Sequence, residues 1–519
     1  MTKKFAAEYA GYVYDESENT WTSKEELKKK LQKVKLNSTA PLPAGGLPVF
    51  VEGNNAYIDT SDGHTAFMAI SGMKKSICGF MPLIAMLARA GENLIITDPK
   101  GELYNRMSGH LETQGYTVRC LNFRNLDQDG YNVLEYPAIT YRFKDKDKGS
   151  MLLSDIIDVL SSKQKAHSRI DPYWQDTATK FMYGTGIVMF ECFDMDHINM
   201  LSWANLNTEE QVPSLKNVIA SVKARNAAMT GLREVLSEPD KTLMSTTTTA
   251  GSFLVPCLKN EKLVRMLSKS TFSLGELCKP KTALFIITDD TTSVYDEIIG
   301  IIISQIQSFL LDRAYVMPEE KLATRVNFVM DEFASYVLPP SQMQNALATH
   351  RSRNIRYYLC VQSLSGLASR YEHYEALLLN CATTVFLGST ESAMLSHVSK
   401  QCGTTNITEN GSEIPLAREF DLITLKKSWE SKEAIYCNVS EGIRYFTNLP
   451  SIEAYGIKAR APIARHTVFP EVPVYTVKEL ITDINAGRAF LPFSEVKKAK
   501  GIKDVMSKEV ERKYNLLFK

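Results

Sequence analysis

Short apolar runs alternate with segments of helical periodicity in the first third of the chain. Between residues 49 and 141, the runs TAFMAI, NLIITD and YTVRCLNF are separated by segments whose apolar residues recur every three or four positions. Runs of this length and composition predict strands, and the segments between them predict helices. The alternation therefore predicts βαβ units and a parallel sheet.

The pattern changes near Lys144 and returns near Lys281. Segments such as MLLSDIIDVLSS and TATKFMYGTGIVMFECF have helical spacing, and about 110 residues contain no convincing strand, which predicts an all-α insertion. Five further strand-like runs follow: KTALFIITDD (281–290), RVNFVMDEFA (325–334), IRYYLCVQS (355–363), TTVFLGS (383–389) and EAIYCNVS (433–440). We therefore predict an α/β core that is split around the helical insertion.

The two ends of the chain are basic. Residues 20–35 contain a capping box of Ser23 with Glu26 and place Leu27, Leu31 and Val34 on one face of a predicted helix. A solvated surface helix is the first interpretation, and contact with phosphates or anionic lipid is the alternative. A Pro- and Gly-rich linker follows, and the lysine-rich last 23 residues predict a frayed helix or a tail.

Composition limits the function only loosely. The chain of 519 residues is 44% apolar and 23% charged, as in ordinary globular proteins of several domains. Its net charge of +1 gives no global attraction for nucleic acid, so such binding would need local patches or a pore. The nine cysteines are never two residues apart, which favours buried, reduced thiols over zinc ligands or disulfides. No apolar stretch reaches the ~20 residues of a membrane span, and we expect a cytoplasmic protein.

The first motif with chemistry lies between a predicted strand and a predicted helix. In TAFMAISGMKKSICGF, Lys75 and Ser76 match the last two positions of G-x-x-x-x-G-K-[ST], the loop that cradles phosphates. Ala69 and Lys74 occupy the two positions where that motif requires glycine. We expect the loop residues Ser71, Gly72, Met73, Lys74, Lys75 and Ser76 to contact a nucleotide.

Two acids end a later strand. RVNFVMDEFA places Asp331 and Glu332 at the carboxyl edge of the predicted sheet, where parallel α/β folds bind ligands. Asp331 with Ser76 is the candidate Mg²⁺ site, and Glu332 would orient the attacking water. Gln362 ends the next apolar strand and could sense the γ-phosphate. Asp98, in the sharp turn TDPKGE, could support the loop lysine or the metal, or bond its own backbone.

The order of these segments resembles one family. DGHTAFMAISGMKKS, LIITDPKGELY, GYNVLEY, DPYWQDTATKF, TALFIITDD, FVMDEFAS, RSRNIRYYLCVQSLSGLASRY and NCATTVFLGS are similar, in order and spacing, to the type IV secretion coupling proteins of the TraG and TraD kind. The resemblance covers about residues 20–450. It implies a RecA-like P-loop NTPase core, ATP and Mg²⁺ as cofactors, and transfer of DNA, single-stranded or double-stranded, into a conjugative secretion channel.

The resemblance also implies a domain division and partners. We expect a basic arm and linker (1–48), a nucleotide-binding domain in two parts (49–144 and 256–460), an all-α domain (145–255) and a C-terminal extension with a basic tail (461–519). Implied partners are relaxase and relaxosome proteins, other type IV secretion ATPases, channel proteins and further copies in a hexameric ring. A neighbour's arginine would stabilise the transition state, and Arg353 and Arg370 are the candidates.

Two departures leave alternatives open. Most family members begin with transmembrane helices, and this sequence offers none, so we expect a small membrane protein to recruit the chain to the inner face of the membrane. A lysine at a motif glycine costs about 1–2 kcal/mol if the loop needs positive φ, and the Lys74 ammonium could either assist the phosphates or obstruct them. We expect nucleotide binding and leave hydrolysis open between an ATP-driven DNA translocase and a non-hydrolysing docking receptor for the relaxase complex. A chromosome-partition motor of the FtsK kind is a third interpretation, which the DPKGE turn does not support.

Overall fold

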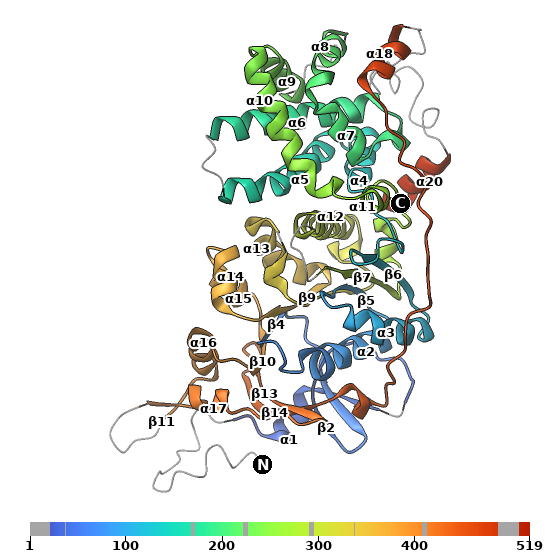
Figure 1. Ribbon diagram of the computed structural model, residues 1–519. Coiled ribbons are helices and arrows are strands. Elements are labelled where there is room, and N and C mark those ends of the chain that lie inside the picture. Colours follow the sequence, from blue (N-terminus) through green and yellow to red (C-terminus); the bar gives the residue numbers. More distant parts are fainter. Residues whose placement is uncertain are drawn as a thin grey trace.

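A nine-stranded sheet forms the centre of the molecule (Figure 1). The computed structural model describes residues 21–36, 38–167, 172–221, 227–289, 295–336, 338–406, 413–485 and 508–518. The strand order is β14-β13-β10-β4-β9-β8-β5-β7-β6. The strands are β4 (Thr65–Ala69), β5 (Asn93–Thr97), β6 (Thr117–Asn122), β7 (Thr282–Ile287), β8 (Val326–Met330), β9 (Ile355–Val361), β10 (Thr383–Gly388), β13 (Ser431–Asn438) and β14 (Ile443–Pro450).

The sheet is mainly parallel, as the alternating pattern predicts. Every neighbouring pair from β10 to β6 is parallel, and the two pairs at one edge, β10 with β13 and β13 with β14, are antiparallel, so that β13 alone runs the other way. The eight predicted apolar runs all contain one of these strands. Since parallel strands share their carboxyl edge, the loops after β4, β8 and β9, which are adjacent, open on the same side.

Helices cover both faces of the sheet, so the six strands from β10 to β7 are buried on both sides. On β4, Phe67 and Ala69 belong to the core that contains the helix after the phosphate-loop motif, whereas Ala66 and Met68 belong to the opposite core. The helices around the sheet are α2 (Met81–Arg89), α3 (Glu102–Thr113), α12 (Asp296–Tyr315), α13 (Pro340–Thr349), α14 (Leu364–Arg370), α15 (Tyr374–Leu379), α16 (Ser392–Cys402) and α17 (Glu419–Ile423).

The segment between β6 and β7 folds as a layer of helices, which lies above the sheet in Figure 1. Its described residues contain no strand. Its apolar side chains join the core on one face of the sheet, so the two parts share one hydrophobic cluster. The helices are α4 (Glu135–Ile139), α5 (Lys146–His167), α6 (Pro172–Cys192), α7 (Met200–Leu206), α8 (Val212–Ser221), α9 (Ala227–Leu236), α10 (Asp240–Leu254) and α11 (Glu261–Met266).

The prediction of one amino-terminal helix through residue 35 is wrong. The helix α1 spans Lys24–Lys30, and Gln32–Lys35 form β1, which pairs with β3 (Asn55–Asp59) beside β2 (Leu47–Glu52). Leu27 and Val34 are buried in the same core as α2. The distant pairing with β3 ends the helix early, and it holds this segment against the core.

Lysines of α1 have an intramolecular partner. Lys24 and Lys28 both lie within 2.8 Å of the Glu52 carboxylate on β2. The pKa of Glu52 falls to about 2, chiefly because the Lys24 and Lys28 ammonium groups hydrogen-bond its carboxylate. The single charge of Glu52 therefore balances one of these two basic charges within the chain, and its carboxylate holds both lysines.

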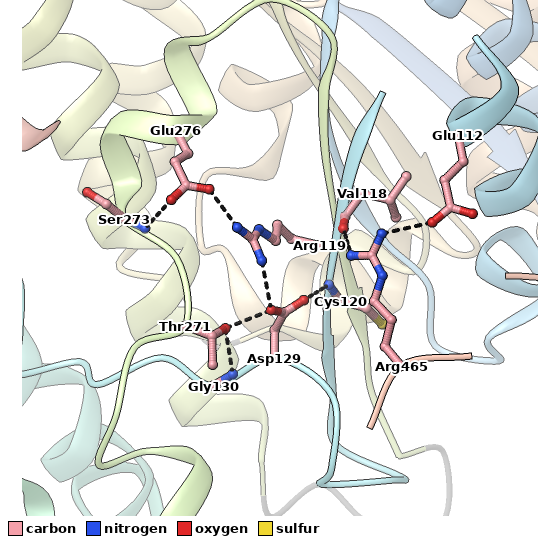
Figure 2. A network of polar contacts seen from close by, with 10 residues as sticks. All are labelled: Glu112, Val118, Arg119, Cys120, Asp129, Gly130, Thr271, Ser273, Glu276 and Arg465. Atoms are coloured by element: carbon pink, nitrogen blue, oxygen red, sulfur yellow. Dashed lines mark hydrogen bonds and ion pairs between the residues drawn. The ribbon is translucent and has the colours of Figure 1, made fainter. Parts of the chain in front are cut away.

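The C-terminal segment runs beside the outer strand β6 and reaches the helical layer (Figure 1). Figure 2 shows Arg465 donating to the Val118 carbonyl of β6, with Glu112 of α3 2.8 Å from its guanidinium. Arg119 of β6 pairs with Asp129 and Glu276 at the same edge. Further along, the helices are α18 (Val477–Asn485) and α20 (Lys508–Phe518). The edge strand is thus covered by side chains of the chain's own terminus.

Eight of the nine cysteines are buried and Cys278 is half-buried, which agrees with their interpretation as packing residues. Within the described residues, no helix combines the length and the apolar character that crossing a membrane would require. A short hairpin-like pair, β11 (Thr404–Asn406) and β12 (Glu413–Pro415), was not predicted.

Candidate nucleotide-binding site

Four predicted site residues meet at the carboxyl edge of the central strands. Lys75 follows β4, Asp331 and Glu332 follow β8, and Gln362 follows β9. The Lys75 Nζ lies 2.6 Å from Asp331 Oδ1 and 3.8 Å from Glu332 Oε1. Gln362 Nε2 donates to the same Glu332 oxygen at 2.7 Å. Residues almost 290 positions apart in sequence therefore form one polar cluster.

The cluster is largely shielded from water. The side chains of Lys75 and Asp331 are 9% and 7% exposed, and that of Glu332 is 24% exposed. Burial alone would lower the pKa of Lys75, but the neighbouring Cys360, Asp331 and Glu332 outweigh it and raise that pKa above its ordinary value. Lys75 is therefore a cation at neutral pH, held where a phosphate could replace one of its carboxylate partners.

Glu332 has a strained backbone. Its φ of 56° and ψ of 47° lie in the left-handed region, which costs a residue with a side chain roughly 1–2 kcal/mol. The neighbouring Asp331 is fixed by its carbonyl, which accepts hydrogen bonds from Thr97 Oγ1 of β5 and from the Tyr336 hydroxyl. Strain that the surroundings maintain is common at functional sites, since it fixes a side chain in a working direction.

The loop after β4 lies over the end of β10. The Ile70 N–H donates to the Gly388 carbonyl, and Met73 packs against Gly388. Ser71 and Gly72 are exposed, and Gly72 has a φ of +81°. Ser76 is half-buried in the first turn after the loop, where the helical segment Lys75–Phe80 begins. The loop thus presents a glycine, two serines and the buried lysine at one edge of the sheet.

Lys74 adopts the conformation that the missing motif glycine would favour. Its φ is 59° and its ψ 25°, which lie in the left-handed region, where a residue with a side chain has a higher conformational energy than glycine. Its ammonium donates to the carbonyls of Ser428 and Trp429, at 2.5 and 2.8 Å. Its side chain is therefore bound to a neighbouring turn, a position that the sequence did not predict.

Asp98 is separate from the hydrogen-bonded cluster. It accepts from the Tyr104 N–H at 2.7 Å and so helps to start α3, in line with the interpretation as a turn acid bonded to backbone. Burial raises its pKa to about 7, although the Tyr104 hydrogen bond opposes the rise and nearby Asp331 adds to it. Asp98 thus affects the electrostatics of the site from behind the sheet edge.

The two candidate arginines differ in their surroundings. Arg353 lies 2.5 Å from Glu320 and stacks on the ring of Tyr315, so an ion pair within the chain occupies it. Arg370 is exposed at the C-terminal end of α14. Neither belongs to the Lys75 cluster of the same chain, as expected for a group that acts on a neighbour's site.

One element of this edge was missed from the sequence. The turn of residues 426–431, which leads into β13, contacts the loop after β4 (residues 70–76), called here the phosphate loop. One contact is made by the Lys74 ammonium, and the other is a 3.4 Å hydrogen bond from Lys427 Nζ to the Gly72 carbonyl. Trp429, at its tip, is 91% exposed. A lone tryptophan in the polar run KKSWESK is the signal that could have drawn attention to it.

The residues present fit a magnesium-bound triphosphate. A buried lysine and a loop with a positive-φ glycine suit phosphate oxygens, and a serine hydroxyl with aspartate oxygens suits Mg²⁺. The described residues contain no cluster of three or more His, Cys, Asp or Glu side chains that could hold a metal by themselves.

Comparisons with known proteins agree with this architecture. The coupling protein TrwB lacking its N-terminal part, in complex with sulphate, matches with a TM-score of 0.58 and 16% identity, over 90% of this chain and 99% of that chain. TrwB with the ATP analogue ADPNP matches with a TM-score of 0.59 and 16% identity, over 89% of this chain and 100% of that chain. TrwB with ADP and Mg²⁺ matches with a TM-score of 0.55 and 16% identity, over 89% of this chain and 99% of that chain. No curated protein sequence matches.

The structural matches establish the fold, and a family model establishes the family. At 16% identity, the matches show that the core is a RecA-like P-loop NTPase fold, here interrupted by an all-α insertion. The model of the family described as "Type IV secretory system Conjugative DNA transfer" matches residues 17–431, which is most of the chain. The match includes the phosphate loop, the two strand-end acids and Gln362. The chain belongs to the family of type IV secretory system conjugative DNA transfer proteins.

Proposed function

We propose that this chain is a coupling ATPase, which binds ATP and Mg²⁺ and uses them to deliver a relaxase-bound DNA substrate into a conjugative secretion channel. The observation that carries the proposal is the convergence of Lys75, Asp331, Glu332 and Gln362 within hydrogen-bonding or ion-pair distance. TrwB, which shares the fold, forms complexes with ADPNP and with ADP and Mg²⁺.

The residues have separate roles in this proposal. Lys75 neutralises phosphate charge, and Ser76 and Asp331 hold Mg²⁺, which supplies charge stabilisation to the transferring phosphoryl group. Glu332 orients the attacking water. Gln362, at the end of β9, donates a hydrogen bond to Glu332. It would sense the γ-phosphate, because this hydrogen bond depends on whether the Glu332 carboxylate is bound elsewhere.

Hydrolysis in the presence of DNA tests the proposal. Purified protein should hydrolyse ATP faster when single-stranded or double-stranded DNA is added, and Lys75→Ala or Glu332→Ala should abolish the activity. Lys33→Ala, at an exposed lysine of β1 in the separate three-stranded sheet, is the matched control and should keep it. DNA binding itself should be independent of sequence and fall steeply as salt rises.

A second candidate is a non-hydrolysing docking receptor for the relaxase complex, with another ATPase of the secretion system supplying the work. It is favoured by Ala69 and Lys74 at the two glycine positions and by the tether of Lys74 to the 426–431 turn. Retained ADPNP binding without any hydrolysis, with or without DNA, would support the receptor and exclude the motor.

We further propose that the active form is a hexameric ring, in contact with relaxosome and channel proteins, and that a small membrane protein recruits it to the inner membrane face. The basis is the family together with the lack, within the described residues, of a helix able to cross a membrane. Fractionation of cells with and without the other transfer genes is the test. Stable membrane association of the chain expressed alone would contradict a separate anchor.

A further inference from the structure

A fully exposed tryptophan stands beside the phosphate loop. Trp429 is 91% exposed, whereas Trp203 is completely buried and Trp21 and Trp174 are half-buried. Single exposed apolar side chains are common on protein surfaces, so the position of this one beside the loop, and not its exposure alone, sets it apart. Its place is specific, since β13 runs antiparallel to β10 and therefore begins at the edge where β4 and β10 end.

The turn that carries Trp429 is rigidly built. Ser428 and Ser431 exchange hydrogen bonds across it, and the Lys427–Lys432 bridge closes it. The ammonium of Lys432, on a completely buried residue, donates to the carbonyls of Leu425 and Lys426. The tryptophan thus lies on a preorganised support, and holding it in place requires little further ordering on binding.

Lys74 ties this support to the phosphate loop. Its ammonium lies over the Trp429 ring, 5.5 Å from the centroid, while it donates to the two turn carbonyls. One face of the ring is therefore oriented by a cation, and the exposure of 91% leaves the other face open. The residue that replaces the motif glycine is thus the one that holds an aromatic side chain against the loop that leads to Lys75.

We propose that the open face of Trp429 stacks on the base of the bound nucleoside triphosphate and that Lys74 is the positioning residue of this base platform. The inference rests on the proposed nucleotide binding at Lys75. A ligand anchored there by its phosphates carries a flat aromatic base on the same molecule. Such stacking would accept different nucleobases, but a ligand without a base could not make it.

A small nucleotide fits the observations better than a DNA strand. The turn touches the phosphate loop itself, through Lys74 and through the Lys427 contact with Gly72. The loop could therefore bind the phosphates of a nucleotide while the adjoining turn binds the base of the same molecule. A strand of DNA would need a longer track of exposed aromatic and basic groups, and none of the present contacts defines one.

Paired ligands test the platform. Equilibrium titrations would compare Mg²⁺·ADPNP with Mg²⁺·tripolyphosphate, which lacks a base. Trp429→Ala should weaken ADPNP binding about tenfold and leave tripolyphosphate binding unchanged. Trp429→Tyr should restore most of the affinity. Lys74→Gly should weaken ADPNP more than tripolyphosphate. Phe420→Ala, at another exposed aromatic residue on the neighbouring α17, is the control and should change neither.

Fluorescence gives a second readout. ADPNP should quench the emission of the wild-type protein, tripolyphosphate should not, and Trp429→Phe should remove the quenching. Equal ADPNP affinity of Trp429→Ala and the wild-type protein would overturn the platform while the proposed function stands. Loss of DNA binding in Trp429→Ala with unchanged ADPNP binding would assign the tryptophan to DNA and also overturn it. A wild-type protein that binds neither ligand would contradict the proposed function itself.

Discussion

At the scale of single residues, the fold strongly changes the charge state of Asp98. Its folded pKa of about 7 lies above the ordinary aspartate value of 3.8. A carboxyl with a raised pKa stabilises the fold fully below its unfolded pKa, and this stabilisation is lost as the pH rises through the folded value. Asp98 therefore destabilises the protein increasingly between about pH 4 and pH 7.

Asp98→Asn should remove this dependence. The amide oxygen can still accept from the Tyr104 N–H but the side chain cannot ionise. Relative to the wild-type protein, the variant should gain about 2–3 kcal/mol in free energy of unfolding between pH 5 and pH 8. Urea denaturation at a series of pH values measures this. Glu210→Gln, at an exposed acid, should show no such gain, and identical pH profiles for Asp98→Asn and wild type would contradict the shifted pKa.

The sequence predicts the residues of the cluster better than their neighbours. Lys75, Asp331, Glu332 and Gln362 each follow an apolar run, so the rule that parallel strands share a carboxyl edge brings them together. The partner of Lys74 could not be predicted in this way. It lies some 350 residues away on a surface turn, where neither periodicity nor a motif fixes the contact.

At the scale of elements, the C-terminal helix α20 docks closely on the short helix Leu274–Cys278. A Cβ atom added at Gly275 would lie 1.6 Å from the Leu516 carbonyl oxygen. The Lys513 ammonium lies 2.8 Å from the Glu135 carboxylate of α4, and Tyr514 and Phe518 pack against aromatic residues of that layer. This contact leaves no room for a side chain at Gly275.

Gly275→Ala should therefore displace α20. Hydrogen exchange of residues 508–518 should speed up and proteases should remove the C-terminus sooner, while the sheet keeps its protection. Gly231→Ala in α9 is the matched control, since nothing lies within 4 Å of an added Cβ there. That change should stabilise its helix by about 0.5–1 kcal/mol. Unaltered exchange at α20 in Gly275→Ala would disprove the docking.

Elements were predictable where the local pattern decides them. The core strands are continuous apolar runs, because both faces of the sheet are covered, and every one of those predicted is present. The helix predicted through residue 35 failed because Gln32–Lys35 pair with β3. Alternation over four residues is too short a signal, and pairing with a distant strand overrides helical spacing.

At the scale of the whole molecule, the exposure of Arg370 agrees with a site shared between subunits of a ring. Arg353 is occupied by Glu320, so Arg370 is our candidate for the group contributed to a neighbour. Arg370→Ala should then reduce ATP hydrolysis by at least 100-fold and leave ADPNP binding unchanged. Steady-state hydrolysis and equilibrium titration separate the two effects.

Mixed assemblies test the sharing itself. The Arg370→Ala variant has an intact Lys75 cluster but lacks the arginine, and the Glu332→Gln variant has the arginine but a defective cluster. Each variant should therefore be inactive alone. Mixing the two should restore part of the hydrolysis, because some interfaces combine both intact halves. Mixing Arg370→Ala with the double variant Glu332→Gln/Arg370→Ala should restore none, because no chain in that mixture supplies Arg370. Absence of any recovery in the first mixture would place the arginine elsewhere or exclude a shared site.

The central claim is that Lys75, Asp331, Glu332 and Gln362 hold a magnesium-bound triphosphate. Isothermal titration of Mg²⁺·ADPNP into the full chain, compared with Lys75→Met at matched folded concentration, tests it most directly. The wild-type protein should give saturable heat with a single site per chain, and Lys75→Met should give none. No heat at high protein concentration, or equal binding by the two proteins, would contradict it.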